Sequence, residues 1–486
     1  MLTTIDNSVS SSGRTRQRAW SVLAVTSVTV VVIFINASGL NVALPAMSRD
    51  LQATGSQSAW FLLSYMLVAT AFMLVFGRLA DIFGRRRLYI AGIIVFLAAS
   101  LACGLAPTAE LFIVFRFLQG LGAASVITNN TAILTDTFPA GSLSTGLGIN
   151  ATVAALGQVL GPVVGGLIVD LLGWRWMFLL AVPILALGLV ASMKLIPRPS
   201  TSLRHERMDL LGAMLVVSGL SALVLFVNEI PETGGLNSPL MWGGGLSSLV
   251  FLAAFIAVQR RRRFPLIDLS IFDKSTVLLY VSGFLCSFSN FAVVLLTSLH
   301  LQASLGRTAM EAGLMVVASP VGTTVAAVCA GRLASHFHHA TLTGIGMVLI
   351  ASGVATVALS IWLEWPQSGI ASGLFIVGTG TGLFMTPNTS ALMLNVFPSR
   401  RGIANAVRST LQNAGYLFST SVALGIATLL LAPADRTAAY AGRLSAIGGD
   451  VRAFDVGVLV ALGVLVIAAA AGAATSFASR RCEPQP

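Results

Sequence analysis

The sequence predicts an all-α integral membrane protein with fourteen transmembrane helices. The first observation is composition, because 56% of the 486 residues are hydrophobic and only 10% are charged. Soluble globular chains carry about 25% charged residues. The second observation is the spacing of the charges, which leaves fourteen uncharged runs of 18 residues or more. A spanning helix needs about 20 mostly apolar residues, and the runs lack the alternation of barrel strands.

The uncharged runs define the expected spans in chain order. Lipid offers no water to satisfy backbone N–H and C=O groups, so each run must close its own hydrogen bonds as a helix. The charged segments between runs become loops. The spans are residues 19–48, 51–77, 88–109, 117–135, 137–169, 176–193, 210–228, 233–259, 275–306, 312–331, 333–363, 365–399, 409–434 and 456–479.

The basic residues predict the orientation. With a cytoplasmic N-terminus, 22 of the 29 Lys and Arg residues fall on cytoplasmic segments and six on outer ones, and only Arg116 lies within a span. This asymmetry follows the positive-inside rule and places both termini in the cytoplasm. It also explains the net charge of +11 without a nucleic-acid partner.

An internal repeat divides the chain. The segment "GRLADIF" (77–83) returns as "GRLASHF" (331–337), and "FPAGSLSTGLGINA" (138–151) resembles "FPSRRGIANA" (397–406). Spans one to six therefore correspond to spans nine to fourteen, and spans seven and eight are inserted. Parallel repeats of this kind are typical of transporters. The expected parts are a cytoplasmic N-terminus (1–19), a six-helix bundle (20–196), the inserted spans (197–259), a basic linker (260–275), a second six-helix bundle (276–476) and a cytoplasmic tail (477–486).

The loop "GRLADIFGRRR" (77–87) combines tight helix ends with opposite charges. Its glycines allow close backbone approach, and its carboxylate can pair with a neighbouring arginine or face a helix N-terminus. We expect a latch between moving bundles, and the alternative is an ordinary basic loop. The residues concerned are Gly77, Arg78, Asp81, Gly84, Arg85 and Arg86.

Arg116 begins "RFLQGLGAA" (116–124) deep in span four. An arginine in mid-bilayer costs about 2.5–3.5 kcal/mol on insertion scales, so it marks a functional site by default. The alternative is a structural arginine that caps backbone carbonyls or is bonded to Gln119 and neighbouring asparagines.

Span five contains "GQVLGPVVGG" (157–166), which repeats small residues every four positions. Such faces let helices approach to backbone contact, and proline bends a helix. The pattern indicates a gate between the bundles, although simple close packing gives the same pattern. Its residues are Gly157, Gly161, Pro162, Gly165 and Gly166.

Together these motifs resemble the major facilitator superfamily. The loop pattern, the arginine segment of span four, the glycine segment of span five and "WRWMF" (174–178) resemble its fourteen-span drug:proton antiporter family over residues 20–476. The resemblance implies two six-helix bundles, export by alternating access and a role for Arg116 in proton coupling. With an arginine-rich composition typical of GC-rich genomes, it implies an antibiotic exporter of an actinomycete, for example of a cephamycin-type β-lactam, in the bacterial cell membrane.

One residue departs from this family. Where the family usually has an aspartate in span one, "INASGLNVALP" (35–45) has Asn36, which cannot titrate. No other acid is central to a span. Asp136 and Asp170, which flank span five, remain as candidates for carrying a proton.

The remaining polar residues in the spans predict the substrate class. One fixed positive charge among many amides favours a neutral or anionic amphiphile, since pumps for cations profit from buried acids. The residues expected at the substrate path are Arg116, Asn36, Asn41, Gln119, Gln158, Asn388 and Gln412. Two alternatives stay open: a broad multidrug:proton antiporter for cations and a non-transporting membrane sensor.

Other chemistry finds no support in the sequence. There is no G-x-x-x-x-G-K-[ST] pattern for ATP hydrolysis and no nucleophile–base pattern of an enzyme, so we expect no cofactor. The cluster His336, His338 and His339 could ligate a metal, but replaces arginines of the first repeat, and no metal is expected. The expected partners are a small-molecule drug, membrane lipid and protons.

Overall fold

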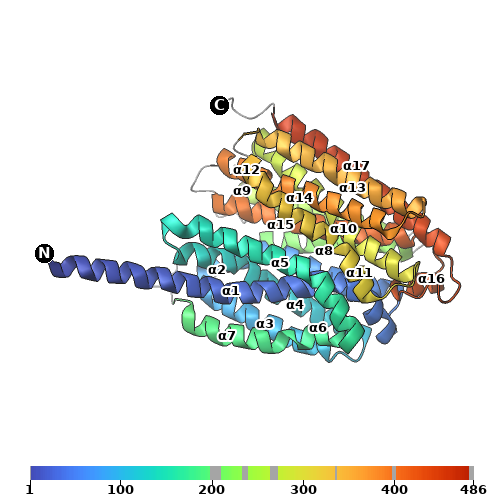
Figure 1. Cartoon of the computed structure of the whole chain (residues 1–486), viewed down its shortest axis with the longest axis horizontal. Helices are drawn as coiled ribbons and strands as arrows, with labels where there is room; N and C mark the ends of the chain where they lie inside the picture. Colours follow the sequence, from blue (N-terminus) through green and yellow to red (C-terminus); the bar gives the residue numbers. More distant parts are fainter. Residues whose placement is uncertain are drawn as a thin grey trace.

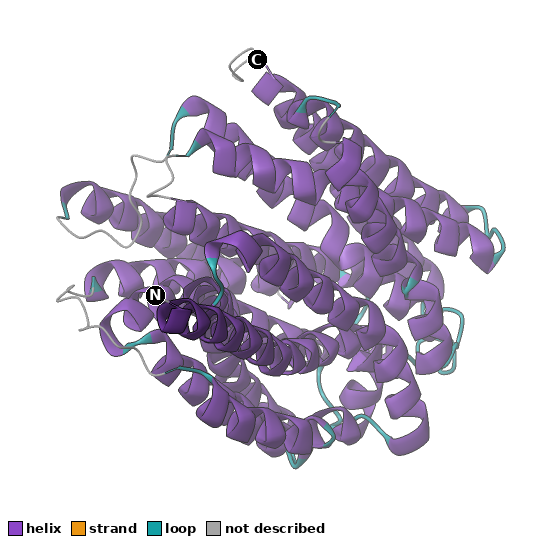
Figure 2. Cartoon of the chain, turned by 60° about the vertical axis from the view of Figure 1, so that its left-hand side comes forward, coloured by secondary structure: helices purple, strands orange, loops and turns teal. Residues whose placement is uncertain are grey.

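The computed structural model describes residues 2–197, 209–232, 239–262, 272–333, 336–396 and 401–480. In this part of the chain all regular structure is helical, and no strand occurs (Figure 2). Twelve of the described helices are long and apolar enough to cross a membrane. The predicted all-α membrane fold is therefore confirmed.

The N-terminal bundle consists of the first seven helices. In it α1 packs on α5 and α7, and α4 packs on α2 and α3. The run predicted as span six is divided into two short helices, α6 and α7. The bounds are α1 Leu2–Asp50, α2 Gly55–Phe83, α3 Arg85–Gly104, α4 Ala109–Thr137, α5 Ala140–Leu172, α6 Arg175–Leu179 and α7 Ala181–Leu195.

The C-terminal bundle lies beside the first one (Figure 1). Here α14 packs on α12 and α13, and α17 packs on α13, α10 and α15. Span ten is divided into α11 and α12. The bounds are α10 Lys274–Ala303, α11 Ala309–Val316, α12 Ala318–Leu333, α13 His339–Trp362, α14 Gln367–Asn395, α15 Arg401–Thr428, α16 Pro433–Tyr440 and α17 Val451–Ser479.

The two inserted spans form a pair of their own. Helices α8 (Leu210–Glu232) and α9 (Pro239–Arg261) pack on each other, and α8 also contacts α2 of one bundle and α15 of the other. Described helices thus occupy all fourteen predicted runs. In α8 the apolar part, Leu210–Phe226, is shorter than the twelve spanning helices, and α15 contains two arginines. A count of fourteen spans is compatible with the fold and stays a prediction.

Local sequence signals set the helix ends. Thr54 and Gln57 form a capping box at the start of α2, which satisfies two of the free N–H groups there. Gly84 separates α2 from α3 with φ of +92°, a backbone conformation that side chains disfavour. We call the end of the molecule at which α1 stops the Asp50 end, and the opposite end, at the α2–α3 connection, the Arg85 end.

The hydrophobic core is continuous between the bundles. Its largest cluster joins residues of both bundles, for example Leu44 and Met47 of α1 with Ala309 and Ala312 of α11 at the Asp50 end. Two smaller clusters lie toward the Arg85 end. One contains residues of α1–α7 such as Tyr89, and the other contains residues around Tyr280 of α10. The bundles therefore share one large core, and each has a smaller core of its own toward the Arg85 end.

Candidate functional site

A buried polar network surrounds Arg116 on α4. Arg116 is 1% exposed, donates from Nε to the Phe61 carbonyl oxygen at 3.0 Å and donates to Gln119 Oε1. Its guanidinium carbon lies 4.3 Å from the centre of the Tyr65 ring. No carboxylate of the described chain forms an ion pair with it. Neutral oxygens and an aromatic face therefore hold this charge in place, as a buried cation requires.

Gln119 extends the network to α1. Its Nε2 donates to Ser100 Oγ at 2.8 Å and to Asn36 Oδ1 at 3.4 Å, and Asn36 Nδ2 donates to the Met177 carbonyl oxygen at 3.4 Å. The structure thus brings together Arg116, Gln119 and Asn36 as the sequence predicts. Asn36 serves as donor and acceptor at once, which a carboxylate could not do.

Asn41 lies apart from this network. It is 6% exposed, and the described residues give its side chain no hydrogen bond. The neighbouring Val42 carbonyl accepts from Gln302 Nε2 of α10 at 3.1 Å, a contact between the bundles. Asn41 therefore lies near the place where the bundles meet at the Asp50 end.

A second polar site lies in the C-terminal bundle, between α10, α14 and α15. Its lining includes the predicted residues Asn388 and Gln412, together with Arg408 and Tyr280. Arg408 joins Arg116 as a second arginine in the interior of a helix. Helix α15 begins at Arg401, ahead of the expected run 409–434, and so brings Arg408 into the helix interior. The polar stripe Arg408, Gln412, Tyr416, with its four-residue spacing, is the signal that could have revealed it.

The glycines of α5 face two different helices. A Cβ added at Gly161 would lie 3.0 Å from Gly39 N of α1, and one at Gly165 would lie 2.9 Å from Gly39 Cα. Gly157 similarly packs against Phe34 and Val31 of α1. These three glycines pack within the N-terminal bundle and allow the two helices to touch along their backbones.

Gly166 and Pro162 instead face the other bundle. A Cβ added at Gly166 would lie 2.6 Å from the Ala309 carbonyl oxygen, and one added at Gly313 would lie 2.3 Å from the Pro162 carbonyl oxygen. Asp170, farther along α5, accepts from the Met310 backbone N–H at 2.9 Å. These contacts of α5 with α11 close the Asp50 end of the space between the bundles.

Gln158 shows where the contact of α5 with α11 ends. It lies four residues before Pro162 and eight before Gly166, on the same face of α5. Pro162 and Gly166 are buried, whereas Gln158 is exposed. The contact of α5 with α11 therefore ends within one helical turn, whereas α2 and α15 stay in contact between the bundles, for example through Asn413 Nδ2 and Met73 Sδ at 3.4 Å.

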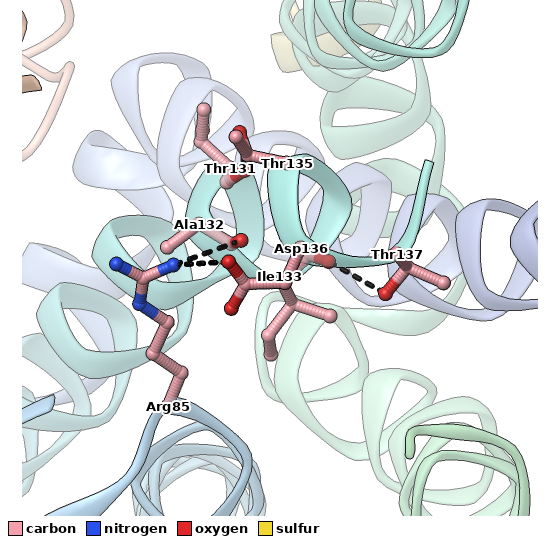
Figure 3. A network of polar contacts seen from close by, with 7 residues as sticks. All are labelled: Arg85, Thr131, Ala132, Ile133, Thr135, Asp136 and Thr137. Carbon is pink, nitrogen blue, oxygen red and sulfur yellow. Dashed lines mark hydrogen bonds and ion pairs between the residues drawn. The ribbon is translucent and has the colours of Figure 1, made fainter. Parts of the chain in front are cut away.

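The loop residues act inside the N-terminal bundle. Arg85 Nη1 pairs with Asp136 Oδ1 of α4 at 2.6 Å and also reaches the Ala132 carbonyl oxygen at 3.4 Å (Figure 3). Arg86 donates to the carbonyl oxygens of Met193 and Ile196 at 2.6 and 2.9 Å. The first turn of α3 is thus fastened to the ends of α4 and α7.

The remaining predicted residues of the loop and the two candidate proton carriers lie near helix ends. Gly77 has ordinary contact distance to Thr128, Arg78 is exposed to an intermediate degree, and the side chain of Asp81 lies outside the described part. Asp136 lies at the Arg85 end and Asp170 at the Asp50 end, so the structure does not bring these two carboxylates together or into the Arg116 network.

Comparisons with known proteins agree with this architecture. The model of the Major Facilitator Superfamily matches residues 26–420. The multidrug resistance protein Stp of Mycobacterium tuberculosis is 31% identical, over 80% of this chain and 72% of its own length. The methylenomycin A resistance protein of Streptomyces coelicolor is 29% identical, over 82% and 83%.

Solved structures share the fold at low sequence identity. A bacterial homologue of the lysosomal transporter Spinster, in an inward-facing and unoccupied conformation, has a TM-score of 0.64 at 16% identity and covers 96% of this chain and 97% of its own. The POT family transporter PepTSo has a TM-score of 0.67 at 12% identity, over 96% and 99%. With the family model matching most of its length, this chain belongs to the major facilitator superfamily and is a membrane transporter rather than an enzyme.

Proposed function

We propose that this transporter exports a neutral or anionic amphiphilic antibiotic or drug across the bacterial cytoplasmic membrane by alternating access. The observation that carries the proposal is the charge of its interior. Arg116 and Arg408 both lie inside helices, and no carboxylate among the described residues pairs with either. Such a path attracts an anion and repels a cation.

The positive-inside rule supports the direction of transport. Arginines gather at the N-terminus and at the Arg85 end, so this end faces the cytoplasm and the Asp50 end faces outward. In that orientation the α5–α11 contact closes the outer side, and the exposed Gln158 on the cytoplasmic side of this contact supports a path that opens to the cytoplasm. An exporter collects its substrate in this state. Relatives that are named as drug or antibiotic resistance proteins support the same direction.

Asn36 supports transport that is driven by the membrane potential and needs no coupled proton. An anion that leaves an interior-negative cell gains about 2.3 kcal/mol per charge per 100 mV, which corresponds to roughly fifty-fold accumulation outside. A titratable group in the centre of the path is therefore dispensable for a carboxylate substrate. Asp136 and Asp170 stay as the residues to substitute first if protons prove to be coupled.

Uptake into inverted membrane vesicles tests the proposal. The probe is a radiolabelled anionic β-lactam of the cephamycin type, offered with a lumen-positive potential alone or with a pH gradient alone. We expect uptake with the potential alone, and none in vesicles that lack the protein. Uptake that requires the pH gradient would contradict potential-driven export. Uptake of cationic dyes in place of anions would indicate a multidrug antiporter.

A further inference from the structure

We propose that the pocket between α10, α14 and α15, here named the Arg408 pocket, binds the acid group of the exported substrate. This inference rests on the proposed function and assigns the substrate's carboxylate to a definite place. The pocket is lined by residues of three helices of the C-terminal bundle, and none of its lining side chains is acidic.

The hydrogen bonds of Arg408 leave it ready for an anion. Its Nε donates to Asn405 Oδ1 at 3.1 Å, one Nη to Gln412 Oε1 at 3.0 Å and the other to Ser409 Oγ at 3.3 Å. All three acceptors are neutral and belong to α15 itself. A guanidinium carries five N–H donors, so two remain for a ligand. Since these three bonds leave its charge without a counterion, a carboxylate in the pocket would supply the missing partner.

The neighbouring polar groups also present donors. Asn388 Oδ1 accepts from Ser282 Oγ at 3.4 Å, which leaves the Asn388 amide hydrogens available. Gln412 Nε2 donates to the Tyr416 hydroxyl at 2.7 Å, and this hydroxyl is also hydrogen-bonded to Ser287, so Tyr416 holds Gln412 in place rather than facing the ligand. A site in which several donors surround a cation favours an acceptor-rich anion over a cationic or purely apolar ligand.

The rest of the lining is apolar and aromatic. Leu279, Phe284 and Met385 form much of the wall, with the ring of Tyr280 beside them. Tyr280 is held in place by its hydroxyl, which donates to the Ala404 carbonyl oxygen at 3.2 Å. The free space inside the pocket is about 10 Å³, which holds a small polar group and not a ring. The expected ligand is therefore an amphiphilic carboxylic acid whose acid group enters the pocket and whose apolar part lies outside it.

The position of Arg408 near the Arg85 end of α15 fits binding of substrate from the cytoplasm, the first step of export. Arg408 is the eighth residue of α15, which starts at the Arg85 end. At 1.5 Å per residue it lies about 10 Å along the helix. This is the half of the molecule in which each bundle has a smaller core of its own. A carboxylate that arrives from the cytoplasm would thus meet Arg408 in the C-terminal bundle on the cytoplasmic side.

Equilibrium binding to the purified protein tests the assignment. The probes are fluorescein, an anion with a carboxylate, and rhodamine 123, a cation with a similar ring system, each followed by fluorescence anisotropy. We expect Arg408→Gln to weaken fluorescein binding about 10- to 100-fold, the loss of a hydrogen-bonded charge, and to leave rhodamine 123 no weaker. Arg408→Lys should recover part of the affinity, since it keeps the charge without the planar fork. The matched control is Arg452→Gln on the exposed start of α17, which should bind fluorescein as the wild type does.

A second measurement needs no variant. Phenylglyoxal modifies accessible arginines, and mass spectrometry reports the rate at each site. Bound fluorescein should slow the modification of Arg408 and leave that of Arg452 unchanged. Equal fluorescein affinity in Arg408→Gln, or equal modification of Arg408 with and without fluorescein, would overturn the Arg408 pocket. The proposed function fails separately, if the wild type takes up no anionic β-lactam into inverted vesicles.

Discussion

The contact of Gly313 with Pro162 offers a direct way to disturb the closed end of the path. A Cβ at position 313 would lie 2.3 Å from the Pro162 carbonyl oxygen, whereas real Cβ atoms essentially never come closer than 3.0 Å. Both groups belong to helix backbones, so neither can rotate away. The Gly313→Ala substitution must therefore move α11 from α5 by about 0.7 Å, the difference between these two distances.

The steric cost of the added methyl group is present only in the conformation in which α5 and α11 are in contact. Overpacking by an extra carbon costs about 1–3 kcal/mol, and the contact disappears when the bundles part at the Asp50 end. Since about 1.4 kcal/mol corresponds to a factor of ten, Gly313→Ala should shift the conformational equilibrium by roughly 5- to 150-fold toward the state that is open at this end.

Spin labels across the Asp50 end would measure this shift. Arg49 of α1 and Arg443, which follows α16, are close enough to interact electrostatically across the bundles, and both side chains are exposed. In a cysteine-free background, labelled Arg49→Cys and Arg443→Cys should give a short distance in double electron–electron resonance. Gly313→Ala should add a longer distance at the expense of the short one.

A matched glycine controls for the added methyl group. A Cβ at Gly463 of α17 would meet nothing within 4 Å, so Gly463→Ala should leave the distance distribution as it is. If Gly313→Ala gives the same distribution as Gly463→Ala, the α5–α11 contact does not hold the Asp50 end closed.

Three further substitutions test the Arg85 end and the Asn36 position. The Arg85–Asp136 pair is 36% and 58% exposed, so Arg85→Gln should cost less than about 1 kcal/mol. Arg86→Gln removes two charged hydrogen bonds to carbonyl groups and should cost about 2 kcal/mol. Thermal unfolding midpoints in detergent compare them, and a larger drop for Arg85→Gln would contradict this ranking. Asn36→Asp places a titratable group 3.4 Å from the Gln119 amide, so uptake into inverted vesicles should gain a dependence on the pH gradient. A driving force unchanged from the wild type would exclude a coupling role for this position.

Much of the fold follows from the sequence because lipid imposes a simple rule. Uncharged runs must become helices, and the recurrence of "GRLADIF" as "GRLASHF" pairs the two bundles. The Arg116 network was also predictable, since a costly interior arginine must find polar partners and the nearest are Gln119 and Asn36. The extension of α15 back to Arg401 does not follow from the sequence, because the charge rule ends a span at the nearest arginine and so leaves Arg408 outside it. An arginine with a polar stripe beside it can stay inside a helix that lines a polar path.

The contacts between the bundles could not be read from the sequence. The glycines at 157, 161, 165 and 166 look alike in the pattern, yet three face α1 and one faces α11. Asp170 similarly accepts from a backbone N–H of the other bundle, which depends on how the bundles are placed. Only packing between distant segments decides which side of a helix meets which neighbour.

The central claim, that an anion moves without a coupled proton, is tested most directly by the charge carried per substrate. Purified protein in proteoliposomes would be given a labelled anionic β-lactam while electrical current and lumenal pH are recorded together. We expect one net negative charge to move with each monovalent substrate and no accompanying proton flux, because Asn36 in the Arg116 network cannot titrate. Electroneutral transport, or a proton moving against each substrate, would contradict this mechanism.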